Sequence, residues 1–281
     1  MAEGIVAVST FHNRTRRTAS IPRRLVREGK LHLIPVYYLG LTTALGKEAI
    51  ENSGSYDFAD HIYGNRPAGR FLIGYLLDAL FLNLKSARAL RSRYRYARSE
   101  IQRLITERAD PIDVLAVPCG LARELFEVSA WLAGEHRNRQ VRLCGMDLDQ
   151  ELVNRLDVTS RRLGSGIGFV CGDALSADAY PTQAFDGIVS LGFTEFLDDT
   201  RAAAFYRLAH GKLKPGGRFV TSGMRAHRLS DYLLRNVADL QTSYRSAETL
   251  RGLARQAGFE QISTYGDRTG LQTMLIGVKQ P

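Results

Sequence analysis

The chain has 281 residues, of which 44% are hydrophobic and 24% charged, a composition typical of a soluble globular protein of one large or two modest domains. Its three cysteines (Cys119, Cys144 and Cys171) form no CxxC pair, which argues against a disulfide framework and a structural zinc site. We therefore expect buried free thiols in the reducing cytoplasm, and no metal. Residues 1–10 lack a signal-peptide pattern, and no apolar run reaches the roughly 20 residues of a transmembrane helix.

The formal net charge of +9 is concentrated at the start of the chain. Residues 1–110 hold 18 of the 38 Lys and Arg residues but only 10 of the 29 Asp and Glu residues. Such a basic segment fits an acidic partner, which is a nucleic acid, an anionic membrane surface, or a substrate with a carboxylate or phosphate group. A solvated basic face without any ligand has the same composition, so this alternative stays open.

Residues 1–110 show helical rather than alternating patterns. The Arg-rich stretch 11–30 is expected to be partly disordered. Residues 69–83 are apolar nearly all round, which predicts a helix packed on two sides. Residues 85–108 follow as a basic helix, with an inner stripe formed by Leu90, Tyr94 and Ile101.

A mixed segment at 56–66 precedes the apolar helix and is predicted to be a loop. It combines aromatic residues, carboxylates, a histidine and an arginine, as substrate sites often do. The candidate substrate residues here are His61, Tyr63 and Arg66, and Arg66 or Arg70 has the geometry to pair with a carboxylate. Packing between domains is the alternative explanation.

From residue 111 onward, strand-like and helix-like segments alternate. Strands are expected at 112–117, 141–147, 167–170, 186–191, 217–222, 259–265 and 272–278, and helices near 122–137, 149–164, 199–213 and 246–257. This alternation predicts a doubly wound α/β fold whose sheet is mainly parallel. Ser246 is expected to cap the last helix at its N-terminus and Gly258 to end it, while Lys214–Gly217 forms a turn.

Four stretches carry chemistry at the ends of these strands. The first strand runs into Val117-Pro118-Cys119-Gly120, a tight turn before a helix whose free N–H groups suit an anionic or polar ligand. The second ends in Asp147-Leu148-Asp149, 27 residues after Gly120, where a carboxylate can accept hydrogen bonds from ribose hydroxyls and Asp149 can cap the next helix. The third leads into Gly172-Asp173-Ala174, and the fourth is Phe185–Leu197.

Together with the turn Leu213-Lys214-Pro215-Gly216-Gly217, these stretches resemble the ordered motifs of class I S-adenosylmethionine-dependent methyltransferases over about residues 111–281. The first motif departs from the family pattern, because Ala116 stands at the acidic position, Pro118 at the first glycine and Ala122 at the third. The resemblance implies a Rossmann-like, seven-stranded, mainly parallel sheet with an antiparallel last strand. A nicotinamide-dependent dehydrogenase would need GxGxxG at the first turn, which this chain lacks.

The resemblance also implies where the cofactor binds. S-adenosylmethionine, released as S-adenosylhomocysteine, would contact residues that follow the first four strands: Val117, Pro118, Cys119, Gly120, Asp147, Leu148, Gly172, Asp173, Ala174, Ser190, Leu191 and Gly192. Phe193 and Thr194 would line the acceptor side of the transfer site. Methyl transfer depends largely on positioning, so a base is needed only when the acceptor must lose a proton. The candidates for that base are Glu195 and His227.

The resemblance places substrate specificity in the added N-terminal segment, so residues 1–110 are expected to form a helical lid and residues 111–281 the cofactor domain. A small or medium-sized, natural-product-like acceptor is the first hypothesis. A lipid or fatty acid, then RNA, are the alternatives, although no RNA-binding module is recognisable. A protein with this fold that does not catalyse transfer, and a homodimer, also stay open.

Overall fold

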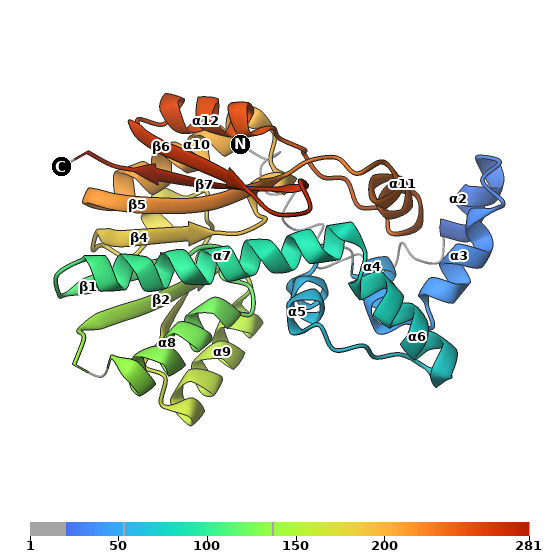
Figure 1. Cartoon of the computed structure of the whole chain (residues 1–281), viewed down its shortest axis with the longest axis horizontal. Helices are drawn as coiled ribbons and strands as arrows, with labels where there is room; N and C mark the ends of the chain where they lie inside the picture. Colours follow the sequence, from blue (N-terminus) through green and yellow to red (C-terminus); the bar gives the residue numbers. More distant parts are fainter. Residues whose placement is uncertain (1–20, 53, 137, 281) are drawn as a thin grey trace. The chain divides into compact units, whose positions relative to one another are not determined.

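The computed structural model describes residues 21–52, 54–136 and 138–280 (Figure 1). Contacts divide the chain into two units. The helical unit contains the described residues up to Arg91 together with Ala226–Gln241, and the sheet unit contains Ser92–Arg225 and the residues from Thr242 onward. Helix α7 (Lys85–Glu107) begins in the helical unit and ends in the sheet unit. The domain boundary at residue 110 remains a prediction.

The sheet unit contains a single seven-stranded sheet in the order β3-β2-β1-β4-β5-β7-β6. Neighbouring strands pair in parallel from β3 to β5, whereas β7 runs antiparallel to both β5 and β6. The predicted doubly wound sheet with an antiparallel last strand is therefore confirmed. The strands are β1 Ile112–Ala116, β2 Val141–Asp147, β3 Gly168–Cys171, β4 Phe185–Ser190, β5 Leu213–Met224, β6 Gln261–Gly266 and β7 Gln272–Val278.

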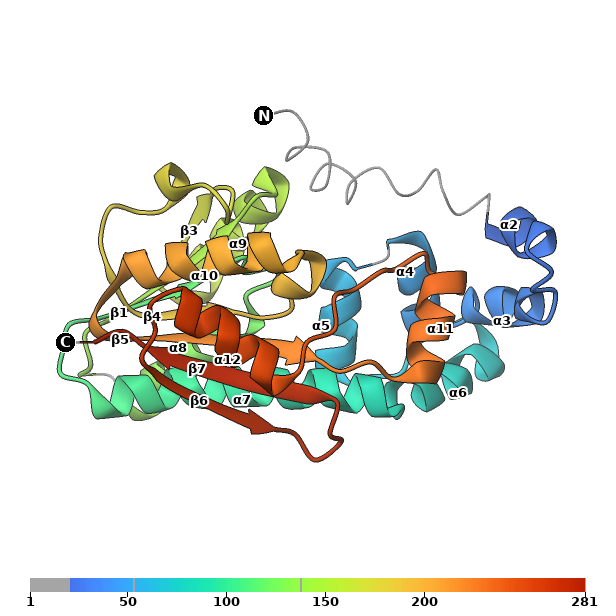
Figure 2. The same cartoon turned by 90° about the horizontal axis from the view of Figure 1, so that it is seen from above.

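Helices cover both faces of this sheet. Helices α10 (Asp199–Lys212) and α12 (Ala247–Gln256) lie beside each other over one face (Figure 2), where apolar residues of both join those of the strands in a single core. Helices α7, α8 (Arg123–Glu135) and α9 (Gln150–Leu163) lie on the other side (Figure 1). A short 3-10 turn, Ala177–Ala179, follows β3.

The sequence signals at the helix ends act as predicted. Asp149 caps α9 by accepting hydrogen bonds from the N–H groups of Glu151 and Leu152. Ser246 caps α12 by accepting from the N–H of Thr249. Gly258 follows α12 with a φ of +99°, a conformation that favours glycine.

The Lys214–Gly217 turn lies within β5 as an irregularity of the strand. Leu213 pairs with Phe185, but the next pair is Arg218 with Gly187. Between these two pairs β5 therefore contains more residues than β4, and the additional residues loop out of the ladder. Gly216, with φ of +71°, supports this looped-out path. The strand therefore begins four residues earlier than the predicted 217–222.

An ion-pair cluster ties together the starts of β1, β4 and β5. Lys214 Nζ lies 2.9 Å from Asp113 Oδ2 and 2.7 Å from Asp186 Oδ2. Asp186 also accepts a hydrogen bond from the N–H of Asp113 at 2.8 Å and pairs with Arg108 at 2.8 Å. Both carboxylates are buried, so their charges are compensated here by side chains from neighbouring segments.

The helical unit contains α2 to α6, the first turns of α7, and α11. Their bounds are α2 Ile21–Arg27, α3 Leu33–Gly40, α4 Ala44–Glu51, α5 Tyr56–Gly64, α6 Phe71–Leu82 and α11 Arg228–Val237. Within the Arg-rich stretch 11–30, residues 21–27 form a helix, and residues 11–20 lie outside the described residues, so partial disorder there stays a prediction. One expectation is wrong. Segment 56–64 is helical rather than a loop, because Ser55 accepts from the N–H of Phe58 and Asn65 ends the helix in a left-handed conformation.

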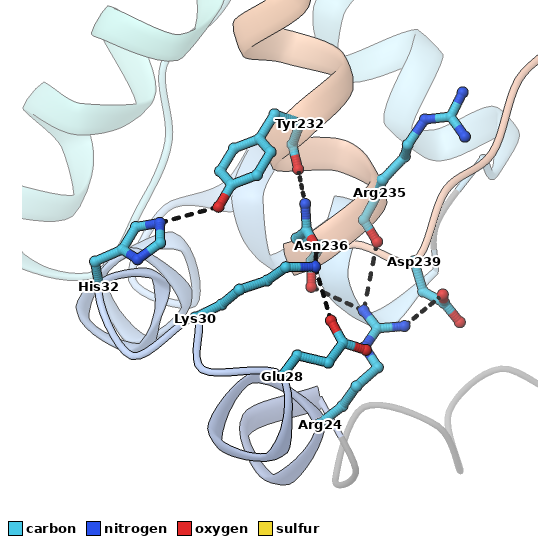
Figure 3. A network of polar contacts seen from close by, with 8 residues as sticks. All are labelled: Arg24, Glu28, Lys30, His32, Tyr232, Arg235, Asn236 and Asp239. Carbon is cyan, nitrogen blue, oxygen red and sulfur yellow. Dashed lines mark hydrogen bonds and ion pairs between the residues drawn. The ribbon is translucent and has the colours of Figure 1, made fainter.

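Helix α11 joins the helical unit although it lies some 200 residues further along the chain. It packs against α2 and α3, where Val237 and Leu233 complete an apolar cluster with Leu25 and Tyr37. Figure 3 shows the polar contacts around that cluster. Arg24 pairs with Asp239 at 2.8 Å and donates to the carbonyl oxygen of Asn236, Lys30 donates to the Asn236 side chain, and His32 contacts the Tyr232 hydroxyl at 3.0 Å.

The prediction of three buried thiols is wrong for one of them. Cys119 and Cys144 are buried and free, but Cys171 is free and exposed. Cys171 ends β3, which is an edge strand of the sheet and has only one neighbouring strand to cover it.

Candidate cofactor site at the carboxyl ends of the strands

The loop after β1 is fixed by its two neighbouring strands. The N–H of Val117 donates to the carbonyl oxygen of Val189 in β4 at 2.8 Å, and the N–H of Cys119 donates to that of Met146 in β2 at 2.8 Å. Gly120 has a φ of +48°, a conformation that favours glycine. Pro118, which carries no N–H, lies between these two anchored residues, so its missing donor leaves the backbone path of the loop intact.

Ala122 keeps a glycine-like backbone. Its φ of +50° lies in the left-handed region, and it immediately precedes α8. This is the position of the third glycine in the family motif. Ala122 therefore has the backbone conformation of the glycine motif although it is not a glycine. For a residue with a Cβ atom, this left-handed conformation costs about 1–2 kcal/mol.

Asp147 connects the ends of three strands. Its Oδ2 accepts a hydrogen bond from the N–H of Gly120 at 2.9 Å, and its backbone carbonyl accepts from the N–H of Gly172 at 2.9 Å. Its other carboxylate oxygen accepts from the N–H of Asp149 at 3.2 Å. Burial raises the pKa of the Asp147 carboxyl, and the hydrogen bonds from Gly120 and Asp149 offset part of that rise. The sequence-predicted residues Gly120, Asp147 and Gly172 therefore form a continuous row at this edge of the sheet.

The segment after β3 is fixed by local hydrogen bonds. Asp173 Oδ1 accepts from the N–H of Leu175 at 2.9 Å, while the carbonyl of buried Ala174 accepts from the Tyr180 hydroxyl at 2.8 Å. Gly172 is closely packed, because a Cβ atom there would lie 3.0 Å from the Cβ of Ala179. Leu148, by contrast, is an exposed apolar residue.

The end of β4 has a buried hydroxyl and a glycine. Ser190 is 1% exposed, and within the described residues its Oγ has no hydrogen-bond partner. Two residues later, Gly192 has a φ of +76°, and a Cβ atom there would lie 2.8 Å from Nη1 of Arg93. Partly buried Leu191 separates them. Gly192, one of the predicted cofactor residues of this strand end, therefore lies beside a buried guanidinium group from α7.

Arg93 is a residue that the sequence analysis missed. It is 4% exposed, and its Nη1 pairs with Oε1 of Glu195 at 3.0 Å. Burial raises the pKa of Glu195, while the charge and hydrogen bond of Arg93 act in the opposite direction. A signal for Arg93 did exist, because it shares a four-residue spacing with buried Ala97, Ile101 and Ile105.

The turn after β4 is held by a second buried arginine. Arg245 donates to the carbonyl oxygens of Thr194 and Leu197 at 2.5 and 2.6 Å. It thereby holds both ends of the 3-10 turn Thr194–Phe196, which contains Glu195. Of the two residues predicted to line the acceptor side, Thr194 is 1% exposed, and Phe193 packs edge-on against Phe205 at a ring distance of 5.1 Å.

The remaining predicted residues belong to the helical unit. His61 Nε2 lies 2.8 Å from Oδ2 of the fully buried Asp78, while Tyr63 is partly buried and Arg66 is exposed. His227 caps α11, with its Nδ1 3.4 Å from the N–H of Ser230 and 2.9 Å from its hydroxyl. The catalytic and substrate roles of these residues remain predictions.

Two kinds of feature are absent from the part of the chain that the structure describes. No group of three or more His, Cys, Asp or Glu residues in that part of the chain is arranged to hold a metal ion. No helix among the same residues is both long and apolar enough to cross a membrane.

Comparison with known proteins agrees with this architecture. A methyltransferase domain family matches residues 114–217, the region from β1 to the start of β5. No curated protein matches the chain. The fold is similar over the full length of both chains to a protein of Bordetella parapertussis described as a possible exported protein, with 19% identity and a TM-score of 0.77.

A second structure shares only part of the chain. Magnesium protoporphyrin IX methyltransferase from Synechocystis PCC 6803, solved with bound S-adenosylhomocysteine, aligns with 69% of this chain and 87% of its own, with 14% identity and a TM-score of 0.52. At such identities the likeness concerns the fold, and the family match adds the type of domain. Residues 114–217 therefore match a methyltransferase domain family, in agreement with the S-adenosylmethionine-dependent methyltransferase motifs that the sequence resembles.

Proposed function

We propose that this chain transfers a methyl group from S-adenosylmethionine to a small or medium-sized acceptor. The observation that carries the proposal is the row formed by Gly120, Asp147 and Gly172 at the carboxyl ends of β1, β2 and β3. Ligands of doubly wound sheets bind at this edge, near the point where the strand order reverses. In this sheet that point lies between β1 and β4.

The residues of the row fit the cofactor despite the altered first motif. Each carboxylate oxygen of Asp147 accepts one hydrogen bond from a backbone N–H group. Because an ionised carboxylate can accept about four hydrogen bonds, two acceptor positions remain for ribose hydroxyls. Asp173 has a second oxygen available in the same way for an exocyclic amine. The left-handed backbone at Gly120 and Ala122 supports the close approach that the amino-acid part of the cofactor requires.

The acidic residue that is missing at Ala116 has a candidate replacement. Glu124 is buried in the first turn of α8, and its charge is one of the influences that raise the pKa of the Cys119 thiol, after burial and Asp147. A carboxylate so close to the loop suits the cofactor ammonium group. Sequence position alone did not suggest this role, because an acid in the first turn of a helix is common.

The bound cofactor supplies a methyl group already activated on sulfonium sulfur, so the chain mainly has to position two reactants. Ser190 and Gly192 would face the transferred group, and the Arg93–Glu195 pair would fix the shape of this wall. Glu195 remains the candidate base for an acceptor that must lose a proton, and His227 is the second candidate. Phe193 and Thr194 would adjoin the acceptor.

The helical unit is the proposed source of acceptor specificity and of the lid. Its α5 contributes His61 and Tyr63, with Arg66 just beyond the helix, and these residues offer aromatic and charged contacts to a compact acceptor. A cytoplasmic location is part of the proposal and is supported by the three free cysteines.

Calorimetric titration with S-adenosylmethionine and S-adenosylhomocysteine tests the proposal. We expect micromolar binding by the full chain and about 10- to 100-fold weaker binding by Asp147→Ala. Asp178→Ala is the matched control, because Asp178 is exposed and lies in the 3-10 turn after β3. A screen of acceptors with labelled methyl groups would then identify the substrate class. No binding at millimolar cofactor would overturn the proposal.

A further inference from the structure

Helix α6 buries its charged residue and exposes most of its apolar side chains. Its buried line is Gly74, Asp78 and Leu82, spaced four residues apart, so the only charged residue of the helix faces inward. The expected packing on two sides is therefore wrong, because most of its apolar residues are exposed. These exposed residues are Phe71 (80%), Leu72 (74%), Ile73 (56%), Tyr75 (47%), Leu76 (56%) and Leu80 (57%).

The orientation of α6 is fixed by specific contacts on its inner side. Asp78 accepts hydrogen bonds from the N–H groups of Leu45 and Ala68 at 2.7 and 3.0 Å and also contacts His61. Gly74 lies so close to another segment that a Cβ atom would be 2.3 Å from the carbonyl oxygen of Thr42. Rotating the helix to bury its apolar face would break these bonds and leave the Asp78 charge without partners, which is costly.

Such a surface is unusual for a protein in water. Apolar residues that cluster on an exposed helix face mark an interaction site rather than ordinary surface variation. We define the α6 face as Phe71, Leu72, Ile73, Tyr75, Leu76 and Leu80. A stable interaction must cover it.

Basic residues flank the α6 face at both ends. Arg66 and Arg70 precede the helix and Lys85 follows it, and all three are exposed. From residue 66 to residue 85 the sequence contains a single acid, Asp78, which is buried. The exposed residues of segment 66–85 therefore combine a broad apolar stripe with positive charge only.

This charge pattern distinguishes between occupants. In a symmetric antiparallel pair of α6 helices, Arg70 of one copy would approach Lys85 of the other at both ends, and this segment offers no exposed acid to compensate the repulsion. An anionic lipid surface matches both features, because its phosphates pair with the flanking cations while the apolar side chains enter the boundary with the acyl chains.

We propose that the α6 face docks this protein onto an anionic phospholipid surface. The helix lies in the plane of the interface, since it is too short to span a bilayer. Asp78 and Gly74 hold the helix body against the protein, and Phe71, Leu72 and Leu76 enter the lipid. The proposal does not depend on the identity of the methyl acceptor or on cofactor binding.

Co-sedimentation of the full chain with vesicles tests the proposal at physiological salt. Vesicles of phosphatidylcholine with 30% phosphatidylglycerol are compared with phosphatidylcholine alone, and we expect at least about tenfold tighter binding to the anionic vesicles. Leu72→Asp with Leu76→Asp should abolish binding. Arg70→Glu with Lys85→Glu should weaken it by at least about tenfold while retaining the apolar stripe.

The control changes exposed apolar residues elsewhere. Val158→Asp with Leu163→Asp replaces two residues of α9 that are each 62% exposed and should bind like the wild type. Unchanged melting temperatures would show that the α6 variants fold. The variant Arg70→Glu with Lys85→Glu is a second, independent test, because it leaves the apolar residues of the α6 face in place. Absence of binding to anionic vesicles, or binding that survives the α6 variants, would overturn the proposal. So would a stable dimer in light scattering that the leucine variants dissociate, since a second copy would then occupy the face.

Discussion

The N–H of Gly120 donates a hydrogen bond to the carboxylate of Asp147 at 2.9 Å, joining the loop after β1 to the end of β2. One side chain thus serves both the protein backbone and the proposed cofactor. Its loss affects the shape of the site as well as the ligand contacts.

Asp147→Ala should weaken S-adenosylmethionine binding about 10- to 100-fold, because each hydrogen bond to a charged group contributes about 1.5–3 kcal/mol. Calorimetric titration measures the change. Asp147→Asn should lose less affinity for S-adenosylmethionine, because the amide oxygen can still accept a hydrogen bond from the N–H of Gly120 when it faces that group. Equal affinity of both variants and the wild type would remove Asp147 from the cofactor site.

Glu195→Gln should lower the free energy of unfolding by about 3 kcal/mol, because it leaves the buried Arg93 guanidinium without its charged partner. Chemical denaturation monitored by circular dichroism measures this. Asp157→Asn, which breaks a surface pair with Arg161, is the control and should change stability little. If Glu195 also acts as a base, Glu195→Gln will remove the acidic limb of the pH–rate profile as well. A stability equal to that of the wild type would show that the pair is not structural.

Lys214→Met should cost about 1–2 kcal/mol near neutral pH and flatten the dependence of stability on pH. Burial raises the pKa of Asp113, but hydrogen bonds from Lys214 and Arg142 outweigh burial and hold it below its ordinary value. The contribution of Asp113 to the free energy of unfolding is present above its pKa in the unfolded chain. It is lost as the pH falls through its pKa in the folded protein.

The pKa of Lys214 shifts in the opposite direction to that of Asp113. Burial lowers the pKa of Lys214, but the hydrogen bonds to Asp186 and Asp113 raise it overall, so its contribution is lost as the pH rises through the native value. The cluster should therefore stabilise the fold between roughly pH 4 and pH 10. Melting temperatures across this range test the prediction, with Lys47→Met as the control because the Lys47 side chain is 56% exposed. An unchanged pH profile in Lys214→Met would contradict it.

Asp78→Asn should reduce the protection of α6 backbone amides in hydrogen exchange and destabilise the helical unit by about 2 kcal/mol. An amide group has a single acceptor oxygen, so it cannot serve both the Leu45 N–H and the Ala68 N–H through separate oxygens. His61→Gln should have a smaller effect, since His61 is partly exposed. Protection of α6 as strong as in the wild type would show that Asp78 does not anchor the helix.

The sequence predicts the sheet unit almost completely, and the reasons are physical. Apolar runs bounded by turn residues mark each buried strand, and caps such as Asp149 and Ser246 mark the helices between them. The row of Gly120, Asp147 and Gly172 also follows from sequence, because parallel strands bring their carboxyl ends to one edge.

The helical unit is less predictable. The signals for α5 were present in Ser55 and Asn65, but its mixed composition favoured a loop. The apolar sequence of α6 does not reveal which side is covered, since that depends on tertiary contacts of Gly74 and Asp78. The burial of Arg93 and Arg245 does not follow from the sequence, because a sequence shows charge but not the carbonyl and carboxylate partners that satisfy it.

The position of α11 has a consequence for biosynthesis. Arg24 and Lys30 leave the ribosome about 200 residues before their partners Asn236 and Asp239. At about 5–20 residues per second, the delay is about 10–40 seconds. During this interval α11 cannot yet cover Leu25 and Tyr37 of α2 and α3, so these helices are synthesised before the sheet unit but complete their packing only after most of it.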